Sequence, residues 1–185
     1  MHFISLDIPD VLHIQHQHQH QHQRHEDERG CFMELFRHQD FTQQCGDLCF
    51  VQDNLSRSRQ GTLRGLHYQR QRPQGKLIQV LAGTIFDVAV DLREGSATYG
   101  QWVGQQLSSE VPMSLWIPPG FAHGFYVQSE IATVLYKCTD YYRPEFERAI
   151  NWADPALAIT WPLMENTPLI LSDKDRQAPF MSSLN

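Results

Sequence analysis

Residues 84–93, TIFDVAVDLR, alternate apolar and charged side chains with a period of two, and this pattern constrains the fold more than any other. The apolar side chains that share one face of an extended chain are Phe86, Val88, Val90 and Leu92. The opposite face carries Asp87, Asp91 and Arg93. Such alternation is typical of a β-strand, in which successive side chains point to opposite faces, and it does not match a helical period.

Similar strand-like runs recur along the chain at residues 100–107, 114–117, 124–127 and 131–139. Turn signals rich in glycine and proline separate them at residues 82–83, 94–96 and 118–120. Helical patterns are limited to residues 38–44 and 172–177. Many short strands at this spacing predict an all-β fold, and a jelly-roll barrel with a few short helices fits best.

Length and charge narrow the class of protein further. The 185 residues predict a single domain over residues 1–185, and the formal charge of −6 supplies no basic surface for nucleic acid. The most apolar run, residues 77–86, is about half of the roughly 20 residues that cross a bilayer, so no membrane is expected as a partner. The N-terminus lacks a signal-peptide pattern and the cysteines form no C-x-x-C pair, which predicts a cytoplasmic protein with reduced thiols.

Residues 13–25 form a low-complexity insert that holds six of the ten histidines, mostly alternating with glutamine. Alternating imidazoles could share one face of a strand and bind Zn, Ni or Cu. The favoured interpretation is a slipped repeat in a surface loop or edge strand, where insertions cost little.

Two segments carry the features of the paired motifs of cupin jelly rolls, which are double-stranded β-helices. They are residues 61–69, GTLRGLHYQ, and residues 118–123, PPGFAH, which match P-x-G-x-x-H. Metal-binding cupins have a His-x-His pair in the first motif, whereas here Tyr68 and Gln69 follow His67. We therefore expect no metal in the cavity, so that side chains must act as acid, base and electrostatic stabiliser.

Further strings resemble one family, the dTDP-4-dehydrorhamnose 3,5-epimerases, which are cofactor-free cupin-fold homodimers. Their order and spacing extend over nearly the whole chain: IPDV (8–11), DERG (27–30), QDN (52–54), LRGLHYQ (63–69), QGK (74–76), FDVAVD (86–91), PGFAHGF (119–125), LYK (135–137) and LSDKDR (171–176). One departure is His25-Glu26, where the family has an aromatic residue and a glycine. That aromatic residue is expected to help hold the nucleotide base across the dimer.

The resemblance implies inversion at C3 and C5 of a sugar that bears a ketone at C4. The hydrogens on these two carbons are acidic because the resulting negative charge delocalises onto the carbonyl oxygen. Inversion removes a proton from one face and returns a proton from the other. The site therefore needs a base, an opposed acid, and a cation or hydrogen-bond donor at the enolate oxygen.

Each of these roles falls to one residue that matches the family. His67 matches the base, since an imidazole readily accepts a proton near neutral pH, and Asp175 matches the partner that orients it. Tyr136 matches the acid, and Lys76 matches the cation near the keto oxygen. Without the resemblance, His67 and Tyr136 would be interpreted as core residues, Lys76 as a solvated strand end, and Ser172-x-x-Asp175 as a capping box.

A second set of residues matches positions that contact the substrate, whose diphosphate requires Arg or Lys. These residues are Arg29, Glu34, Gln52, Asp53, Asn54, Arg64, His123, Glu147 and Lys174. Taken one at a time, they would be interpreted as surface polar pairs. The resemblance also implies that the protein is a homodimer.

The sequence thus predicts an isomerase that converts dTDP-4-dehydro-6-deoxy-D-glucose into dTDP-4-dehydro-L-rhamnose, in dTDP-L-rhamnose biosynthesis for polysaccharides. One alternative is a mono-epimerase that inverts only C3 or only C5 of a related dTDP-4-keto-deoxysugar. An alternative of another class is a non-catalytic sugar-binding or metal-binding cupin module.

Overall fold

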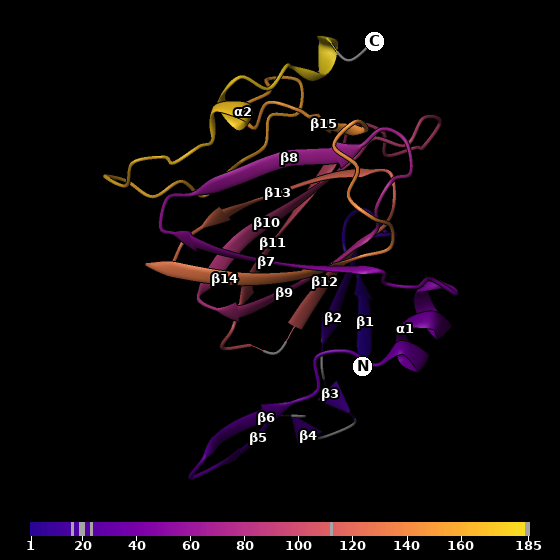
Figure 1. The fold of residues 1–185 in the computed structure, drawn as a ribbon, viewed down its shortest axis with the longest axis vertical. Coiled ribbons are helices and arrows are strands. Elements are labelled where there is room, and N and C mark those ends of the chain that lie inside the picture. The colour runs from indigo at the N-terminus through magenta and orange to yellow at the C-terminus, as the bar shows by residue number, and fades with distance from the viewer. Residues whose placement is uncertain (16, 19–20, 23, 112, 184–185) are drawn as a thin grey trace.

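The computed structural model describes residues 1–15, 17–18, 21–22, 24–111 and 113–183. Two antiparallel sheets form the barrel (Figure 1). Across the six-stranded sheet the order is β1 (His2–Ser5), β2 (Leu12–Gln15), β12 (Met113–Ile117), β9 (Lys76–Ala82), β14 (Ile131–Cys138) and β7 (Gln52–Arg59). Across the five-stranded sheet it is β11 (Trp102–Ser108), β10 (Thr84–Asp91), β13 (Phe121–Val127), β8 (Leu63–Gln69) and β15 (Glu147–Ala149). The predicted all-β fold is confirmed.

The remaining elements are short. Helices α1 (His38–Cys45) and α2 (Asp173–Arg176) lie where the sequence predicts them, and a 3-10 helix spans Met181–Ser183. Two small hairpins, β3 (Gln17–His18) with β4 (Gln21–His22) and β5 (Arg24–Asp27) with β6 (Gly30–Met33), project away from the barrel (Figure 1). Residues 16, 19–20 and 23 of the His/Gln insert lie outside the described residues, so the favoured interpretation of a slipped repeat and the alternative of metal binding both remain untested.

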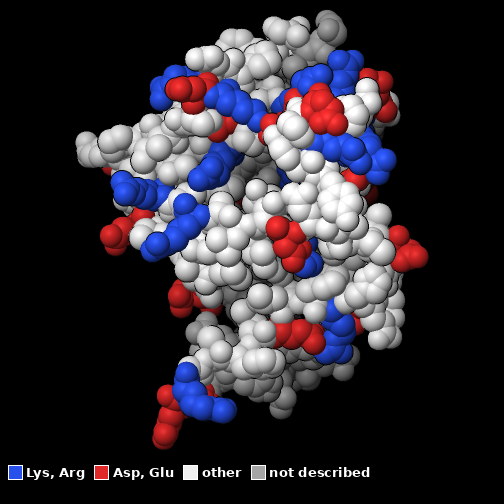
Figure 2. Space-filling model, in the orientation of Figure 1, with Lys and Arg blue, Asp and Glu red and all other residues white. Residues whose placement is uncertain are grey.

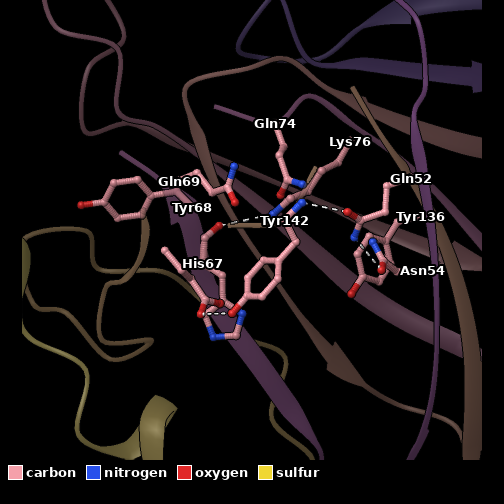
Figure 3. A pocket seen from close by; sticks show the side chains of 10 residues that line it. Gln52, Asn54, His67, Tyr68, Gln69, Gln74, Lys76, Tyr136 and Tyr142 are labelled. Atoms are coloured by element: carbon pink, nitrogen blue, oxygen red, sulfur yellow. Dashed lines mark hydrogen bonds between the residues drawn. The ribbon is translucent and has the colours of Figure 1, made fainter. Parts of the chain in front are cut away.

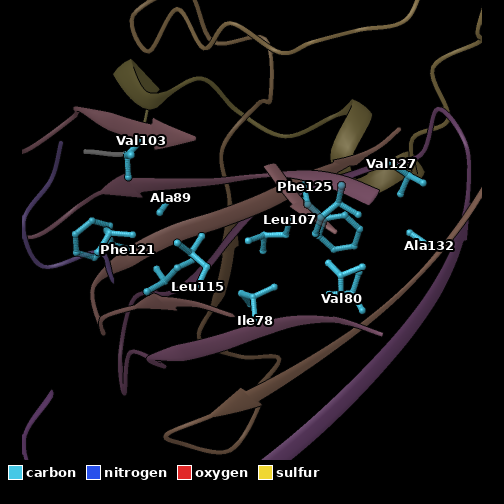
Figure 4. Close-up of a cluster of buried hydrophobic side chains, with 14 of the residues drawn as sticks. Ile78, Val80, Ala89, Val103, Leu107, Leu115, Phe121, Phe125, Val127 and Ala132 are labelled. Carbon is cyan, nitrogen blue, oxygen red and sulfur yellow. The ribbon is translucent and has the colours of Figure 1, made fainter. Parts of the chain in front are cut away.

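The main core fills the space between the two sheets (Figure 4). Ile78 and Leu115 enter it from the six-stranded sheet, and Ala89, Leu107 and Phe125 enter it from the five-stranded sheet. All five side chains are at most 3 % exposed. Burial of this apolar surface holds the two sheets together.

A second core lies on the outer face of the five-stranded sheet, under the C-terminal segment. Val88 and Val90 of β10 pack there with Leu157 and Trp161. Both faces of β10 are therefore buried, although the alternation in its sequence resembles that of a half-exposed strand. As a result its polar face points into the barrel, and the side chain of Asp87 is fully buried.

The described part of the chain contains no helix that is long and apolar enough to cross a membrane.

Candidate active site

A cavity of about 280 Å³ is lined by residues from both sheets (Figure 3). Its lining residues are Gln52, Asn54, His67, Tyr68, Gln69, Gln74, Lys76, Tyr136, Tyr142 and Glu147. Strands β8 and β15 form one wall, and β7, β9 and β14 form the other. All four predicted catalytic residues line this cavity or directly contact a residue that does.

His67 lies on β8, directly opposite His123 of β13 in the antiparallel register. The two strands approach each other closely at Gly65, whose φ is 118°. A Cβ atom at Gly65 would lie 2.5 Å from the Cα atom of Gly124, so only glycine fits here. This close strand packing sets the position of His67, two residues further along β8.

His67 is held by Asp175, with 2.5 Å between Nε2 and Oδ1. Asp175 is 3 % exposed, and Ser172, the N-cap of α2, donates its hydroxyl to Asp175 Oδ2 at 2.8 Å. Burial alone would raise the pKa of Asp175, but the hydrogen bonds from His67 and Ser172 bring this pKa below its usual value. An ionised Asp175 accepts Nε2–H, which leaves His67 Nδ1 to accept a proton.

The capping and the orienting interpretations of Asp175 are compatible, because they use different atoms. The backbone N–H of Asp175 donates to the Ser172 hydroxyl at 3.1 Å, as in a helix cap. Its carboxylate bonds to His67 at the same time. The α2 cap therefore fixes the carboxylate that bonds to the His67 imidazole.

Lys76 and Tyr136 come from the six-stranded sheet, on the wall opposite His67. Lys76 is 8 % exposed, and its ammonium donates to the backbone oxygen of His67 at 3.4 Å. Burial lowers the pKa of Lys76, and the negative charges of Asp87 and Glu147 oppose this shift. Burial raises the pKa of Tyr136, so its phenol holds a proton at neutral pH.

Glu147 of β15 gathers two partners at the edge of the cavity. Its Oε2 accepts a hydrogen bond from the Tyr142 hydroxyl at 2.7 Å and lies 2.5 Å from the Lys174 ammonium. Burial tends to raise the pKa of Glu147, but the bonds from Lys174 and Tyr142 lower it overall. Two predicted substrate-binding residues, Glu147 and Lys174, are thus brought together beside His67.

The predicted Gln-Asp-Asn segment on β7 divides between two faces of the strand. Gln52 and Asn54 line the cavity, and the Gln52 amide donates to Asn54 Oδ1 at 2.9 Å. Asp53 lies on the outer face and pairs with Lys137 at 2.8 Å. The strand alternation therefore places Asp53 outside the cavity lining.

Arg64 and His123 lie near the cavity without lining it. Arg64 is exposed and donates to the Ser58 hydroxyl at 3.0 Å. His123 is 7 % exposed and bonds through Nε2 to Asp87 Oδ2 at 2.9 Å.

Arg29 and Glu34 belong to a different part of the molecule. Arg29 is at the tip of the β5–β6 hairpin, where it forms several hydrogen bonds with Asp27, and Glu34 pairs with Arg37 at 2.9 Å. Figure 1 shows this hairpin at the opposite end of the molecule from β8 and β15. Within one chain these two residues are not brought to the cavity.

Sequence reasoning missed four residues that line the cavity: Tyr68, Gln69, Gln74 and Tyr142. The phenol of Tyr142 reaches toward His67 (Figure 3), and its backbone N–H donates to Gln52 Oε1 at 2.7 Å. Tyr142 follows the end of β14 in a loop, where neither periodicity nor motif marks it. An exposed aromatic side chain in a loop is the one sequence signal that could have indicated it.

Among the described side chains, no group of three or more His, Cys, Asp or Glu is arranged to hold a metal ion. The prediction that the protein needs no metal or cofactor remains a prediction.

A jelly-roll barrel whose cavity combines a histidine–aspartate pair, a tyrosine and a buried lysine defines an acid–base enzyme of the cupin type. The chain belongs to the dTDP-4-dehydrorhamnose 3,5-epimerase family, whose model matches residues 6–183. The predicted family is confirmed, and the protein is an isomerase of the epimerase class.

Individual relatives agree with this membership. The dTDP-4-dehydrorhamnose 3,5-epimerase of Pseudomonas aeruginosa is 57% identical over 152 residues, which cover 82% of this chain and 83% of that protein. The Salmonella typhimurium protein of the same name is 47% identical over 98% of this chain and 96% of its own length. The crystal structure of dTDP-6-deoxy-D-glucose-3,5-epimerase from Legionella pneumophila, in complex with dTDP-4-keto-L-rhamnose, has a TM-score of 0.92 and 50% identity, covering 100% of this chain and 94% of that one. This similarity confirms the predicted cupin-type fold.

Proposed function

We propose that this protein inverts C3 and C5 of dTDP-4-dehydro-6-deoxy-D-glucose, giving dTDP-4-dehydro-L-rhamnose for dTDP-L-rhamnose biosynthesis. The observation that carries the proposal is the placement of His67 and Tyr136 on opposite walls of one cavity. Opposed proton acceptor and donor groups are what inversion at carbon requires. The ligand of the Legionella structure, a 4-keto-deoxysugar nucleotide, supports the same substrate class.

Each inversion moves two protons. His67 Nδ1 takes the proton from the carbon beside the ketone, while its Nε2–H stays bonded to Asp175. The electron pair delocalises onto the C4 oxygen, where the Lys76 ammonium supplies the compensating charge. The Tyr136 hydroxyl then gives a proton to the opposite face of the same carbon. The imidazolium formed at His67 is stabilised by the Asp175 carboxylate.

The size of the cavity indicates that only part of the substrate, the sugar ring, is held inside it. At about 280 Å³ it lies at the lower end of the roughly 300–1,000 Å³ that small-molecule sites usually offer, which suits one sugar ring better than a whole sugar nucleotide. The diphosphate and base would then lie outside it. In the view of Figure 2, Lys and Arg side chains are concentrated in the upper half of the molecule, where Figure 1 places β8 and β15. Such cations are what an anionic diphosphate requires.

A homodimer is part of the proposal. The β5–β6 hairpin projects from the barrel, and Phe32 at this hairpin is 73 % exposed. Arg29 and Glu34, which match substrate-contacting positions, would reach a cavity only in a second subunit. Sedimentation equilibrium should give a mass of about twice 21.5 kDa, and a monomer that retains full turnover would contradict the dimer.

We also propose a cytoplasmic location and a single domain. All four cysteines are free, as expected in a reducing compartment, and residues 6–183 match one family model. Recovery of the protein with cytoplasmic marker enzymes after cell fractionation is the check on its location.

Turnover in deuterated water tests the reaction itself. Each inversion returns a solvent-derived proton, so NMR of the product should show deuterium at both C3 and C5. Label at a single carbon would contradict double inversion and indicate a mono-epimerase. If substrate bound without any exchange, and His67→Ala bound it equally well, a non-catalytic sugar-binding module would be the correct description.

A further inference from the structure

Two aspartates of β10, Asp87 and Asp91, are both 0 % exposed, but their carboxylates have different surroundings. Asp91 uses both oxygens: Oδ1 accepts from Arg93 at 2.9 Å, and Oδ2 accepts from Arg93, Ser96 and Thr98 at 2.6–2.8 Å. This is a fully satisfied carboxylate with its own cation, which stabilises the turn after β10.

Asp87 has a much poorer set of partners. Its Oδ2 bonds to His123 Nε2 at 2.9 Å, whereas its Oδ1 has no hydrogen-bond partner among the described residues. A buried oxygen without a donor is costly, so a carboxylate retained only for stability would be surrounded as Asp91 is. The contrast with Asp91 indicates that Asp87 has a role other than stabilising the fold.

The second observation is a buried cation in the same interior. Lys76 is 8 % exposed and donates only to the His67 backbone oxygen within the described chain, with no carboxylate in ion-pair contact. The nearby carboxylates at the cavity are already paired, since Asp175 bonds to His67 and Glu147 bonds to Lys174. Asp87 bonds to His123 through Oδ2 as Asp175 bonds to His67, but its Oδ1 has no hydrogen-bond partner among the described residues.

We infer that Asp87 is a positioning residue for the epimerisation: its buried carboxylate supplies the negative charge that keeps Lys76 protonated and fixes the tautomer of His123. The inference rests on the proposed function, because Lys76 is useful to the enolate oxygen only as an ammonium. Asp87 itself acts from behind the cavity wall, through Lys76 and His123.

The second part of this role follows from the His123 ring. An ionised Asp87 accepts a hydrogen from His123 Nε2, which makes Nδ1 the acceptor nitrogen of a neutral ring. An asparagine at position 87 could donate to Nε2 and favour the other tautomer. Asp87 therefore determines what His123, directly opposite His67 on β13, can donate or accept.

The groups that act on this network come from five strands. His123 bonds to Asp87 from β13, the charge of Lys76 on β9 acts on both, and His67 of β8 acts on His123. Lys76 is also influenced by Cys138 of β14 and Glu147 of β15. Burial raises the pKa of the Cys138 thiol, so this group stays neutral near pH 7 and supplies no charge. Within the described chain, Asp87 and Glu147 then remain as the charges that oppose the loss of the proton from Lys76.

The test compares Asp87→Asn with Asp91→Asn, a matched change of a fully buried aspartate on the same strand. For Asp87→Asn we expect kcat near neutral pH to fall by about 10–100-fold, as for other residues that support a reacting group, with KM changed by less than about threefold. The basic limb of the kcat profile should move to lower pH, because Lys76 then loses its proton more easily. Asp91→Asn should lower the melting temperature without changing the shape of the profile.

A double-mutant cycle with Lys76→Gln tests whether the effect of Asp87→Asn on kcat depends on Lys76. If Asp87 acts through Lys76, Asp87→Asn should reduce kcat much less in the Lys76→Gln background than in the wild type. Equal losses in both backgrounds would overturn the inference, as would an Asp87→Asn enzyme with the wild-type kcat and pH profile. Loss of folding in Asp87→Asn alone would also overturn it, because this carboxylate is argued not to serve stability. The deuterium pattern of the wild type separately tests the proposed function.

Discussion

Two histidine–aspartate pairs in the described part of the chain are alike in chemistry and different in setting. His67 bonds to Asp175 at 2.5 Å, and His123 bonds to Asp87 at 2.9 Å. The His67 side chain is 30% exposed and borders the cavity, whereas the His123 side chain is 8% exposed. On the proposed mechanism, access to the substrate is what separates His67, the base, from His123.

The two pairs also differ in how the carboxylate is supported. Asp175 receives a second hydrogen bond from Ser172, and these bonds bring its pKa below the usual value despite burial. Burial raises the pKa of Asp87, and the hydrogen bond from His123 and the charge of Lys76 oppose this only partly. The first carboxylate therefore stabilises the folded protein when it is ionised, and the second one costs stability in the same state.

The largest expected effect is that of His67→Ala. Loss of the base should reduce kcat by about 10³-fold or more, because the carboxylate on the same wall, Glu147, is engaged by Tyr142 and Lys174 and does not replace Nδ1 as proton acceptor. Product formation and deuterium uptake followed by NMR measure it. His38→Ala, which removes an exposed histidine at the start of α1, is the matched control and should behave like the wild type. Turnover within tenfold of the wild type in His67→Ala would contradict the proposed base.

Asp175→Asn should have the next largest effect. The asparagine keeps the size of the side chain but does not stabilise the imidazolium, so kcat should fall by about 10²–10³-fold. Ser172→Ala serves as the comparison: loss of the cap should cost about 1 kcal/mol of stability and less than tenfold in kcat. If the two variants lost activity equally, the cap and not the charge of Asp175 would be what matters.

The strands could be predicted from the sequence because their signal is local. Period-two alternation and the glycine and proline turns locate β10 to β14 within a few residues, and α1 is found equally well. The setting of Asp87 could not be predicted in this way. Alternation shows which residues share a face, but the C-terminal segment that covers the opposite face of β10 comes from residues far along the chain.

The site likewise contains residues that the local sequence predicts and residues whose place depends on distant parts of the chain. His67 and Asp175 are separated by 108 positions, so only the resemblance to a family, and no spacing rule, pairs them. Asp53 was grouped with Gln52 and Asn54 as one string, although strand alternation separates its side chain from theirs. Tyr142 was not predicted as a site residue, because its position depends on the path of the loop after β14.

The smallest expected effect concerns stability in acid, where the two pairs should differ in sign. The folded-state pKa of Asp175 is lowered, so its contribution is present above the unfolded-state value of about 3.9 and disappears as the pH falls through the folded value. The folded-state pKa of Asp87 is raised, so ionisation of Asp87 costs stability, and this cost disappears as the acid is protonated.

Urea unfolding from pH 7 to pH 3 should therefore show Asp175→Asn less stable than the wild type near neutrality, by on the order of 1 kcal/mol, with the difference vanishing in acid. Asp87→Asn should be at least as stable as the wild type at pH 7 and lose that advantage in acid. Differences of the same sign for both variants would show that the two carboxylates have equivalent settings, and the comparison on which their separate roles rest would fail.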